Sequence, residues 1–155
     1  MKKSLYSLSI ATVLTLTSIS SQAATDNLVY VAVDPCRIVD TRNAGGPLTT
    51  NTSRNFLVSG TSGQLAVQGG TADCLNPQAG VEPLAISAYV LAIGPVSTGG
   101  VLTAFPAGDP DPAPGAGSTV NFAAGQVIGN TTNISLCDPT GTCPADGEFA
   151  ILARN

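Results

Sequence analysis

The chain has 155 residues, ten acidic side chains against six basic ones, and no histidine or tryptophan. Without histidine, an ordinary Ser-His-Asp or Cys-His catalytic site and an imidazole metal site are excluded. The net charge of −4 disfavours binding to nucleic acid or to an anionic membrane surface, because both require a basic face.

The first 23 residues have the pattern of a secretory signal peptide. Two lysines precede a mostly apolar run (residues 5–19), and Ser-Gln-Ala at residues 21–23 offers the small side chains that a signal peptidase recognises. The apolar run is too short to span a hydrocarbon core of about 30 Å. We therefore expect an exported protein, secreted or held at the cell surface, whose mature chain does not insert into a membrane and forms a single domain over residues 24–155.

Short β-branched segments separated by Gly, Pro, Asn and Ser predict strands, and no stretch has the apolar spacing of a helix. The longest apolar segment, residues 84–96, is expected to be buried on both sides or bent at Gly94-Pro95. In chain order, the predicted strands are residues 28–33, 36–41, 54–59, 64–67, 84–96, 100–105, 118–123, 126–137 and 148–153.

Eight or nine strands without a crossover helix predict antiparallel pairing, because parallel neighbours need long connections. Two packed sheets are the usual arrangement for such a chain. The fold class predicted is therefore all-β, an antiparallel β-sandwich of jelly-roll or immunoglobulin-like type, with the strand order left open.

Four cysteines in an exported chain predict two disulfides rather than a metal site. Cys137 and Cys143 enclose a loop with Pro and Gly that allows its ends to meet, which leaves Cys36 to pair with Cys74. The alternative, a four-thiolate zinc site, needs close paired spacings, and intervals of 38, 63 and 6 residues do not supply them. We expect no metal, no cofactor and no free thiolate nucleophile.

The low charge content, 10% of residues, predicts that apolar side chains also lie outside the core. Exposed apolar patches on soluble proteins often mark a contact surface. We therefore expect self-association, for example as a trimer, or contact with another cell-surface component.

The densest group of charges lies in residues 34–42 (Asp-Pro-Cys-Arg-Ile-Val-Asp-Thr-Arg). Alternation along a strand places Arg37 and Asp40 on opposite faces. Asp40 is expected to accept backbone N–H groups of the following turn, and Arg42 to bind nearby carbonyls or a carboxylate. We interpret Arg37, Asp40 and Arg42 as a structural lock at one end of the sandwich. The alternatives are an anion site formed by the two arginines and a contact between subunits.

Three further groups of residues could form a binding or catalytic site, and each also has a purely structural explanation. Asp109 and Asp111 could bind calcium, but the three prolines around them favour a stiff exposed spacer. A polar group could bind sugars or lie on the wet face of a sheet, and it comprises Asn121, Asn130, Thr132 and Tyr89. The only glutamates, Glu82 and Glu148, could form a carboxylate pair, yet nothing marks a cleft, so we assign no catalytic residue.

Residues 35–42 (Pro-Cys-Arg-Ile-Val-Asp-Thr-Arg), residues 120–126 (Val-Asn-Phe-Ala-Ala-Gly-Gln) and Asn130 resemble a module of exported bacterial proteins. That family carries a Pro-x-Arg-hydrophobic-x-Asp-Thr-Arg motif and an Asn-Phe-x-x-Gly-Gln segment. Between them lie a long apolar strand and a strand ending near Phe-Pro, matched here by residues 85–93 and 103–106. The resemblance covers most of residues 28–153 in one copy and implies a surface or repeat module without an agreed activity.

Together these features predict a secreted or cell-surface structural or interaction module that is not an enzyme. The main alternative is a lectin-like adhesive module that binds glycans or a partner protein. A carboxylate-based hydrolase is the third hypothesis.

Overall fold

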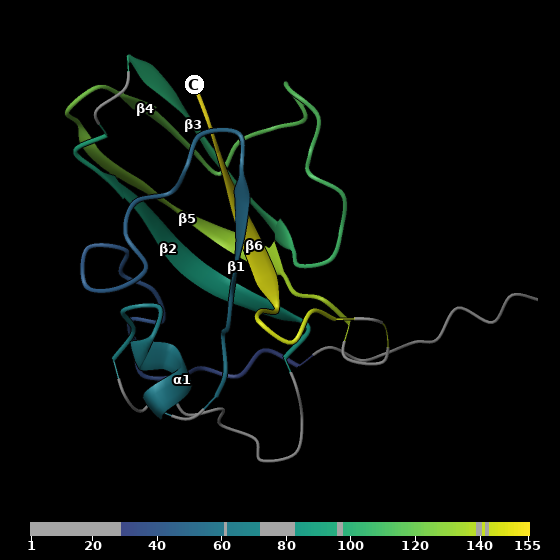
Figure 1. Ribbon diagram of the computed structural model, residues 1–155. Coiled ribbons are helices and arrows are strands. Elements are labelled where there is room, and N and C mark those ends of the chain that lie inside the picture. Colours follow the sequence, from purple (N-terminus) through teal and green to yellow (C-terminus); the bar gives the residue numbers. More distant parts are fainter. Residues whose placement is uncertain (1–28, 61, 72–82, 96–97, 139–140, 142) are drawn as a thin grey trace, which may run out of the picture. The chain divides into compact units, whose positions relative to one another are not determined.

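The computed structural model describes residues 29–60, 62–71, 83–95, 98–138, 141 and 143–155, and its second compact unit runs from Val31 to Asn155 (Figure 1). The predicted signal peptide, Cys74 and Glu82 lie outside the described residues. Six strands and one short helix form in the described part: β1 (Ser53–Phe56), α1 (Ser62–Ala66), β2 (Ala85–Ile93), β3 (Gly99–Pro106), β4 (Val120–Ala123), β5 (Val127–Ser135) and β6 (Phe149–Arg154).

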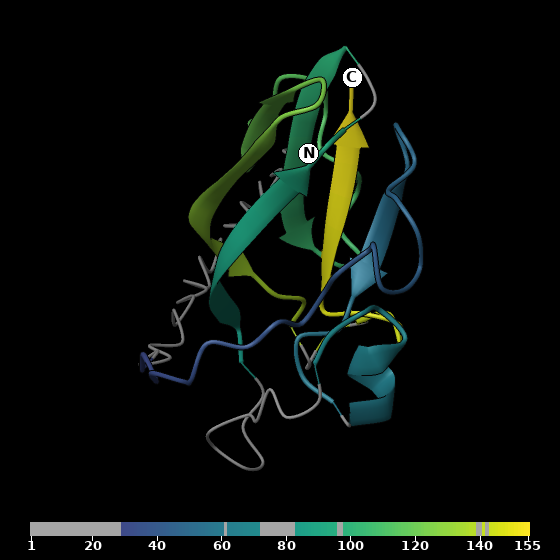
Figure 2. The same cartoon turned by 90° about the vertical axis from the view of Figure 1, so that its left-hand side faces the viewer.

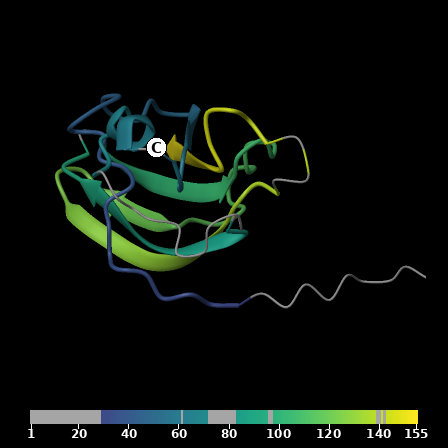
Figure 3. The same cartoon turned by 90° about the horizontal axis from the view of Figure 1, so that it is seen from below.

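The strands form two antiparallel sheets. One has four strands in the order β1-β6-β3-β4, and the other pairs β2 with β5 through nine consecutive residue pairs. Figure 2 shows β2 and β5 side by side, and Figure 3 shows them in a separate layer from β3 and β6. The all-β fold with antiparallel sheets is therefore confirmed, and the arrangement is that of a sandwich.

The main core lies between the two sheets. Ala92 of β2 and Ile134 of β5 pack with Phe56, Phe149 and Ile151 of the larger sheet. The rings of Phe56 and Phe149 are 5.6 Å apart between centroids, on neighbouring strands. Burying such side chains contributes about 1.5–3 kcal/mol each, so this interlayer cluster stabilises the packing of the two sheets.

The strand buried on both faces is β6. Phe149, Ile151 and Ala153 belong to the interlayer core, whereas Ala150 and Leu152 pack with Phe105 in a second cluster. The sequence had favoured residues 84–96 for this position, and that alternative is wrong. In β2 the residues alternate between exposed and covered positions. The strand ends at Ile93, before Gly94, whose φ of +54° favours glycine.

Three predicted strands are absent from the described residues. Residues 29–33 have no regular structure, and residues 36–41 form a single isolated bridge, Val39 with Gly69. Residues 64–67 instead overlap helix α1, whose Leu65 is fully buried. A five-residue helix is too short to show helical periodicity in the sequence.

The disulfide Cys137–Cys143 is confirmed, with a Cα–Cα distance of 5.6 Å. Cys36 is also disulfide-bonded, and its predicted partner, Cys74, lies outside the described residues. None of the cysteines in the described part is free.

Candidate functional site

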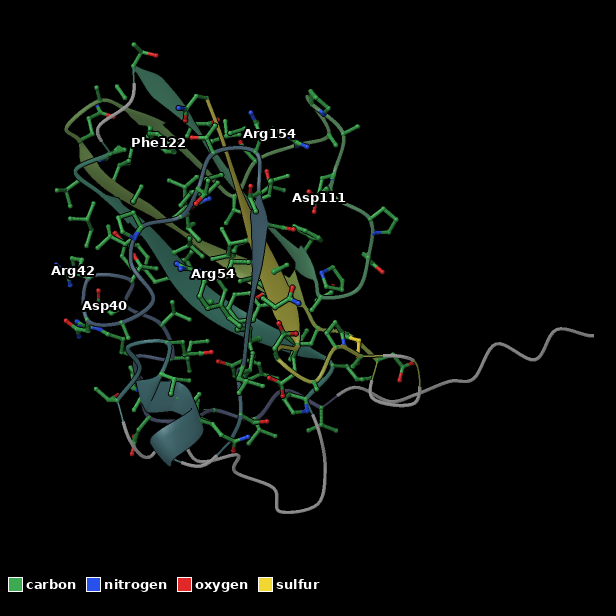
Figure 4. The ribbon with its side chains drawn as sticks, viewed as in Figure 1. Asp40, Arg42, Arg54, Asp111, Phe122 and Arg154 are labelled. Atoms are coloured by element: carbon green, nitrogen blue, oxygen red, sulfur yellow. A yellow bond between two sulfur atoms is a disulfide. The ribbon has the colours of Figure 1, made fainter. Side chains whose placement is uncertain are left out.

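The charged cluster of Arg37, Asp40 and Arg42 assembles around one carboxylate, that of Asp40. Figure 4 shows Asp40 and Arg42 close together. Arg42 grips Asp40 in a bidentate manner: its Nε donates to Oδ1 at 2.9 Å and its Nη2 donates to Oδ2 at 2.7 Å. The backbone N–H of Arg42 also donates to Oδ1 at 3.1 Å, and Arg37 Nη1 donates to Oδ2 at 3.1 Å. Asp40 is only 8% exposed, so both of its oxygens are committed to these donors.

These contacts hold the pKa of the Asp40 carboxyl well below its usual range. The hydrogen bond from the Arg42 side chain is the main cause, opposed by burial and reinforced by the Arg42 backbone N–H and the charges of both arginines. The same pair raises the pKa of Arg42. Because both oxygens of the buried carboxylate accept from arginine donors, the geometry favours an internal structural contact over an anion site, although the side chains of Arg37 and Arg42 are 55% and 58% exposed.

The backbone that carries this cluster is held by the segment after α1. Asp40 N donates to Gln68 O at 3.0 Å, and Thr71 N donates to Arg37 O at 2.8 Å. The Gln68 side chain connects two distant segments of the chain. Its Nε2 donates to Ile38 O at 2.8 Å and to Leu57 O at 2.7 Å, and its Oε1 accepts from Leu57 N. Sequence reasoning missed Gln68, because its partners lie 11 and 30 residues away.

The expectation that strand alternation separates Arg37 from Asp40 is wrong. Residues 36–38 do not form a regular strand, and the chain turns directly after Asp40, where Asn43 N and Ala44 N donate to Asp40 O at 2.9 and 3.2 Å. The side chain of Arg37 contacts the carboxylate three residues ahead.

The four residues proposed for sugar binding do not form one site. Asn121 and Asn130 line a shallow hollow of about 290 Å³, where Asn130 Nδ2 donates to Thr119 O at 3.1 Å. Because side chains alternate along a strand, Thr132 shares the face of Asn130, whereas Tyr89, paired with Thr131, lies on the opposite face of the sheet. The structure therefore separates Tyr89 from the other three.

The outer face of the β2–β5 sheet is apolar at one end. Tyr89, Leu91 and Ile93 of β2 and Val127 of β5 share this face and are 66%, 40%, 41% and 67% exposed; we call these four residues the apolar face. The ring of Tyr89 lies against Gly129, where an added Cβ would approach Tyr89 Cζ to 2.6 Å. Neither β2 nor β5 contains a charged residue.

In the described part of the chain, the acidic residues considered for calcium binding or catalysis do not cluster, and the carboxylate of Glu148 already accepts hydrogen bonds within the fold. Asp109 lines a hollow of about 350 Å³ beside the Cys137–Cys143 disulfide, and Asp111 is exposed on the proline-rich loop (Figure 4). Glu148 Oε1 accepts from Ser59 Oγ at 2.8 Å, and its other oxygen accepts from the Val58 backbone. Among the described residues no group of three or more His, Cys, Asp and Glu side chains could hold a metal ion.

Comparison with protein-family models, with curated proteins and with solved structures finds no match to this chain. In the part of the chain that the structure describes, no helix has the length and apolarity needed to span a membrane. The class that the fold defines is a disulfide-bonded protein whose regular secondary structure is almost entirely antiparallel strand.

Proposed function

We propose that the protein is an exported structural or interaction module that acts by contact rather than by catalysis, and that the outer side of the β2–β5 sheet is its contact surface. The observation that carries this proposal is the apolar face: four large side chains are exposed together on a sheet without charge. Such a surface gains free energy when a second surface covers it, at about 25 cal/mol for each Å² of apolar area. The disulfide fits an oxidising compartment outside the cytosol.

The contact surface is tested with Leu91→Lys. A lysine on an exposed strand opposes association, since its charge must be desolvated. We expect the dissociation constant for self-association to rise at least about 10-fold, because one apolar side chain contributes about 1.5–3 kcal/mol when buried. Sedimentation over a concentration series measures this constant, and calorimetry should show a melting temperature close to that of the native protein, because the lysine stem can cover the sheet.

Val67→Lys is the matched control. Val67 is 73% exposed, as an isolated apolar side chain in the turn after α1, so lysine there should leave association unchanged. Equal association constants for the native chain and Leu91→Lys would contradict the proposal.

Glycan binding is the second candidate, and one observation favours it. Tyr89 is directly opposite Thr131, with Ser87 and Asn133 forming the next pair on the same face. An exposed aromatic ring beside hydroxyl and amide groups can stack on a sugar while its neighbours hydrogen-bond the sugar hydroxyls. This surface uses Tyr89 but not Asn121, Asn130 or Thr132.

For this second function, Tyr89→Ala should weaken glycan binding about 5-fold, because aromatic contacts of this kind contribute about 1 kcal/mol. Tyr89→Phe keeps the ring and should retain most of the affinity. A glycan array followed by titration of any hit measures both variants, and equal loss in the two would exclude stacking as the mode of recognition.

A further inference from the structure

The outer edge of β2 carries a row of backbone groups that no described strand pairs with. Leu136 N donates to Leu84 O and Gly94 N donates to Gln126 O, both at 2.9 Å, in register with the β2–β5 ladder. In an antiparallel pair, hydrogen-bonded and non-hydrogen-bonded residue pairs alternate. The even-numbered residues of β2 therefore bond to β5, and the odd-numbered ones direct N–H and C=O away from it: Ala85, Ser87, Tyr89, Leu91 and Ile93.

Within β2 itself, the sequence features with which soluble proteins block strand addition are absent. Charged residues and proline are absent from β2, and its register with β5 runs one to one over nine residues without a bulge. All five odd-numbered residues are exposed. Figure 2 shows β5 beside β2, and no other described strand pairs with β2. A long, uncharged edge without a bulge is a template for another strand.

Resting on the function proposed above, we propose that a second copy of the chain occupies this edge, with the two β2 strands antiparallel about a two-fold axis at Tyr89. The two sheets then become one, in the order β5-β2 of one protomer followed by β2-β5 of its partner. Charge favours this occupant. The protein is acidic, with a net charge of −4, yet two copies meeting through this sheet place no like charges opposite each other. A charged partner would find no side chain to pair with on either strand.

The strand is also complementary to itself. With the axis at Tyr89, the midpoint of β2, odd-numbered residues lie opposite odd-numbered residues of the partner: Ala85 opposite Ile93, Ser87 opposite Leu91, and Tyr89 opposite itself. Every outward N–H and C=O of the two edges finds an acceptor or a donor. Such an isologous contact joins two copies and no more, and it unites the two apolar faces into one surface.

The inference is tested with Ser87→Pro. Within the protomer the N–H of residue 87 points away from β5, so proline removes no hydrogen bond there, and edge strands tolerate proline. In the dimer the symmetry removes two hydrogen bonds and places two rings in the contact. We expect the dimer dissociation constant, measured by sedimentation, to rise at least about 100-fold.

Asn133→Pro is the matched control, because Asn133 lies directly opposite Ser87 and also directs its N–H away from the pair. It should leave the dimer intact. If Asn133→Pro dissociates the dimer and Ser87→Pro does not, the contact uses the edge of β5 and the inference is overturned.

Cross-linking tests the register independently of any change in affinity. In a hydrogen-bonded antiparallel pair the Cα atoms are about 5.5 Å apart, within the range of about 4.4–6.8 Å that a disulfide spans. Tyr89→Cys should therefore form an intermolecular disulfide under mild oxidation, seen as a dimer on a non-reducing gel. Leu91→Cys, which lies opposite Ser87 of the partner subunit in this register, should not. The reverse result overturns the proposed axis.

The outcomes separate this inference from the function on which it rests. A trimer, or an oligomer that Leu91→Lys dissociates and Ser87→Pro does not, overturns edge pairing and leaves the contact surface in place. A native chain that stays monomeric, with the odd-numbered amides of β2 protected from hydrogen exchange, means that a segment of the same chain fills the edge, and it overturns the dimer.

Discussion

Replacing Gly69 with alanine is expected to lower the melting temperature by about 10 °C or more. Gly69 has a φ of +80°, and an added Cβ would lie 2.0 Å from Asp40 O, inside contact distance of a backbone atom that cannot rotate away. Left-handed backbone at a non-glycine residue costs about 1–3 kcal/mol, and overpacking costs a similar amount. For a domain of this size, each kcal/mol lowers the melting temperature by several degrees. Circular dichroism melts of the two proteins measure the difference.

Gly63→Ala provides the control six residues earlier. Gly63 lies in α1, and an added Cβ there meets nothing within 4 Å. Since alanine is favoured over glycine in a helix by about 1 kcal/mol, this variant should melt at or slightly above the native temperature. If Gly69→Ala has the same melting temperature as Gly63→Ala, the close approach of residue 69 to the Asp40 turn does not hold in solution.

The sequence predicts strands well where a β-branched run ends at a turn. Residues 100–105, 118–123 and 148–153 overlap β3, β4 and β6 almost completely, because Gly, Pro and polar residues mark their ends. It does not predict which strand becomes central. β2 and β6 both read as apolar runs, but β6 has a neighbour on each side and β2 has one. Burial on both faces depends on the position of a strand within its sheet. The strand order decides that position, and it cannot be read from a single sequence.

The candidate site was also predictable only in part from the sequence. The contacts of Asp40 with Arg37 and Arg42 span two or three residues, and local chemistry was enough to predict that Arg42 and the turn would satisfy the carboxylate. The bridge from Gln68 to Ile38 and Leu57 joins distant segments through an amide side chain that has no sequence signal of its own. The apolar surplus was also predictable from composition, whereas its position on β2 and β5 follows only from the alternation of exposed and buried residues in the sheet.

Asp40→Asn is expected to lower the melting temperature at pH 7 by more than about 5 °C. The amide accepts more weakly than the carboxylate, leaves Arg37 and Arg42 without a counter-charge, and replaces an acceptor of the bidentate pair with a donor. Asp40 itself is buried, so water reaches the position of its carboxylate poorly, whereas the side chains of Arg37 and Arg42 are 55% and 58% exposed and can be solvated. Calorimetric melts of native protein and variant between pH 2 and pH 8 measure the difference and its dependence on pH.

The pH dependence has a definite sign. The pKa of Asp40 is lower in the folded chain than its value of about 3.9 in the unfolded chain, so the unfolded state takes up a proton first as the pH falls. The contribution of this carboxylate is therefore complete above about pH 4 and is lost as the pH falls from there toward the lower folded pKa. The melting difference should be constant from pH 8 to pH 5 and shrink below pH 4.

Arg42→Lys tests whether this cluster stabilises the fold or serves a ligand. Lysine keeps the charge but has one nitrogen and cannot reproduce the two parallel hydrogen bonds to Asp40. A structural role predicts a lower melting temperature, with a smaller loss than Asp40→Asn and the same decline in effect below pH 4. A native melting temperature together with lost binding of an anion would instead assign Arg37 and Arg42 to a ligand, because a stabilising contact cannot be weakened without a change in the free energy of unfolding.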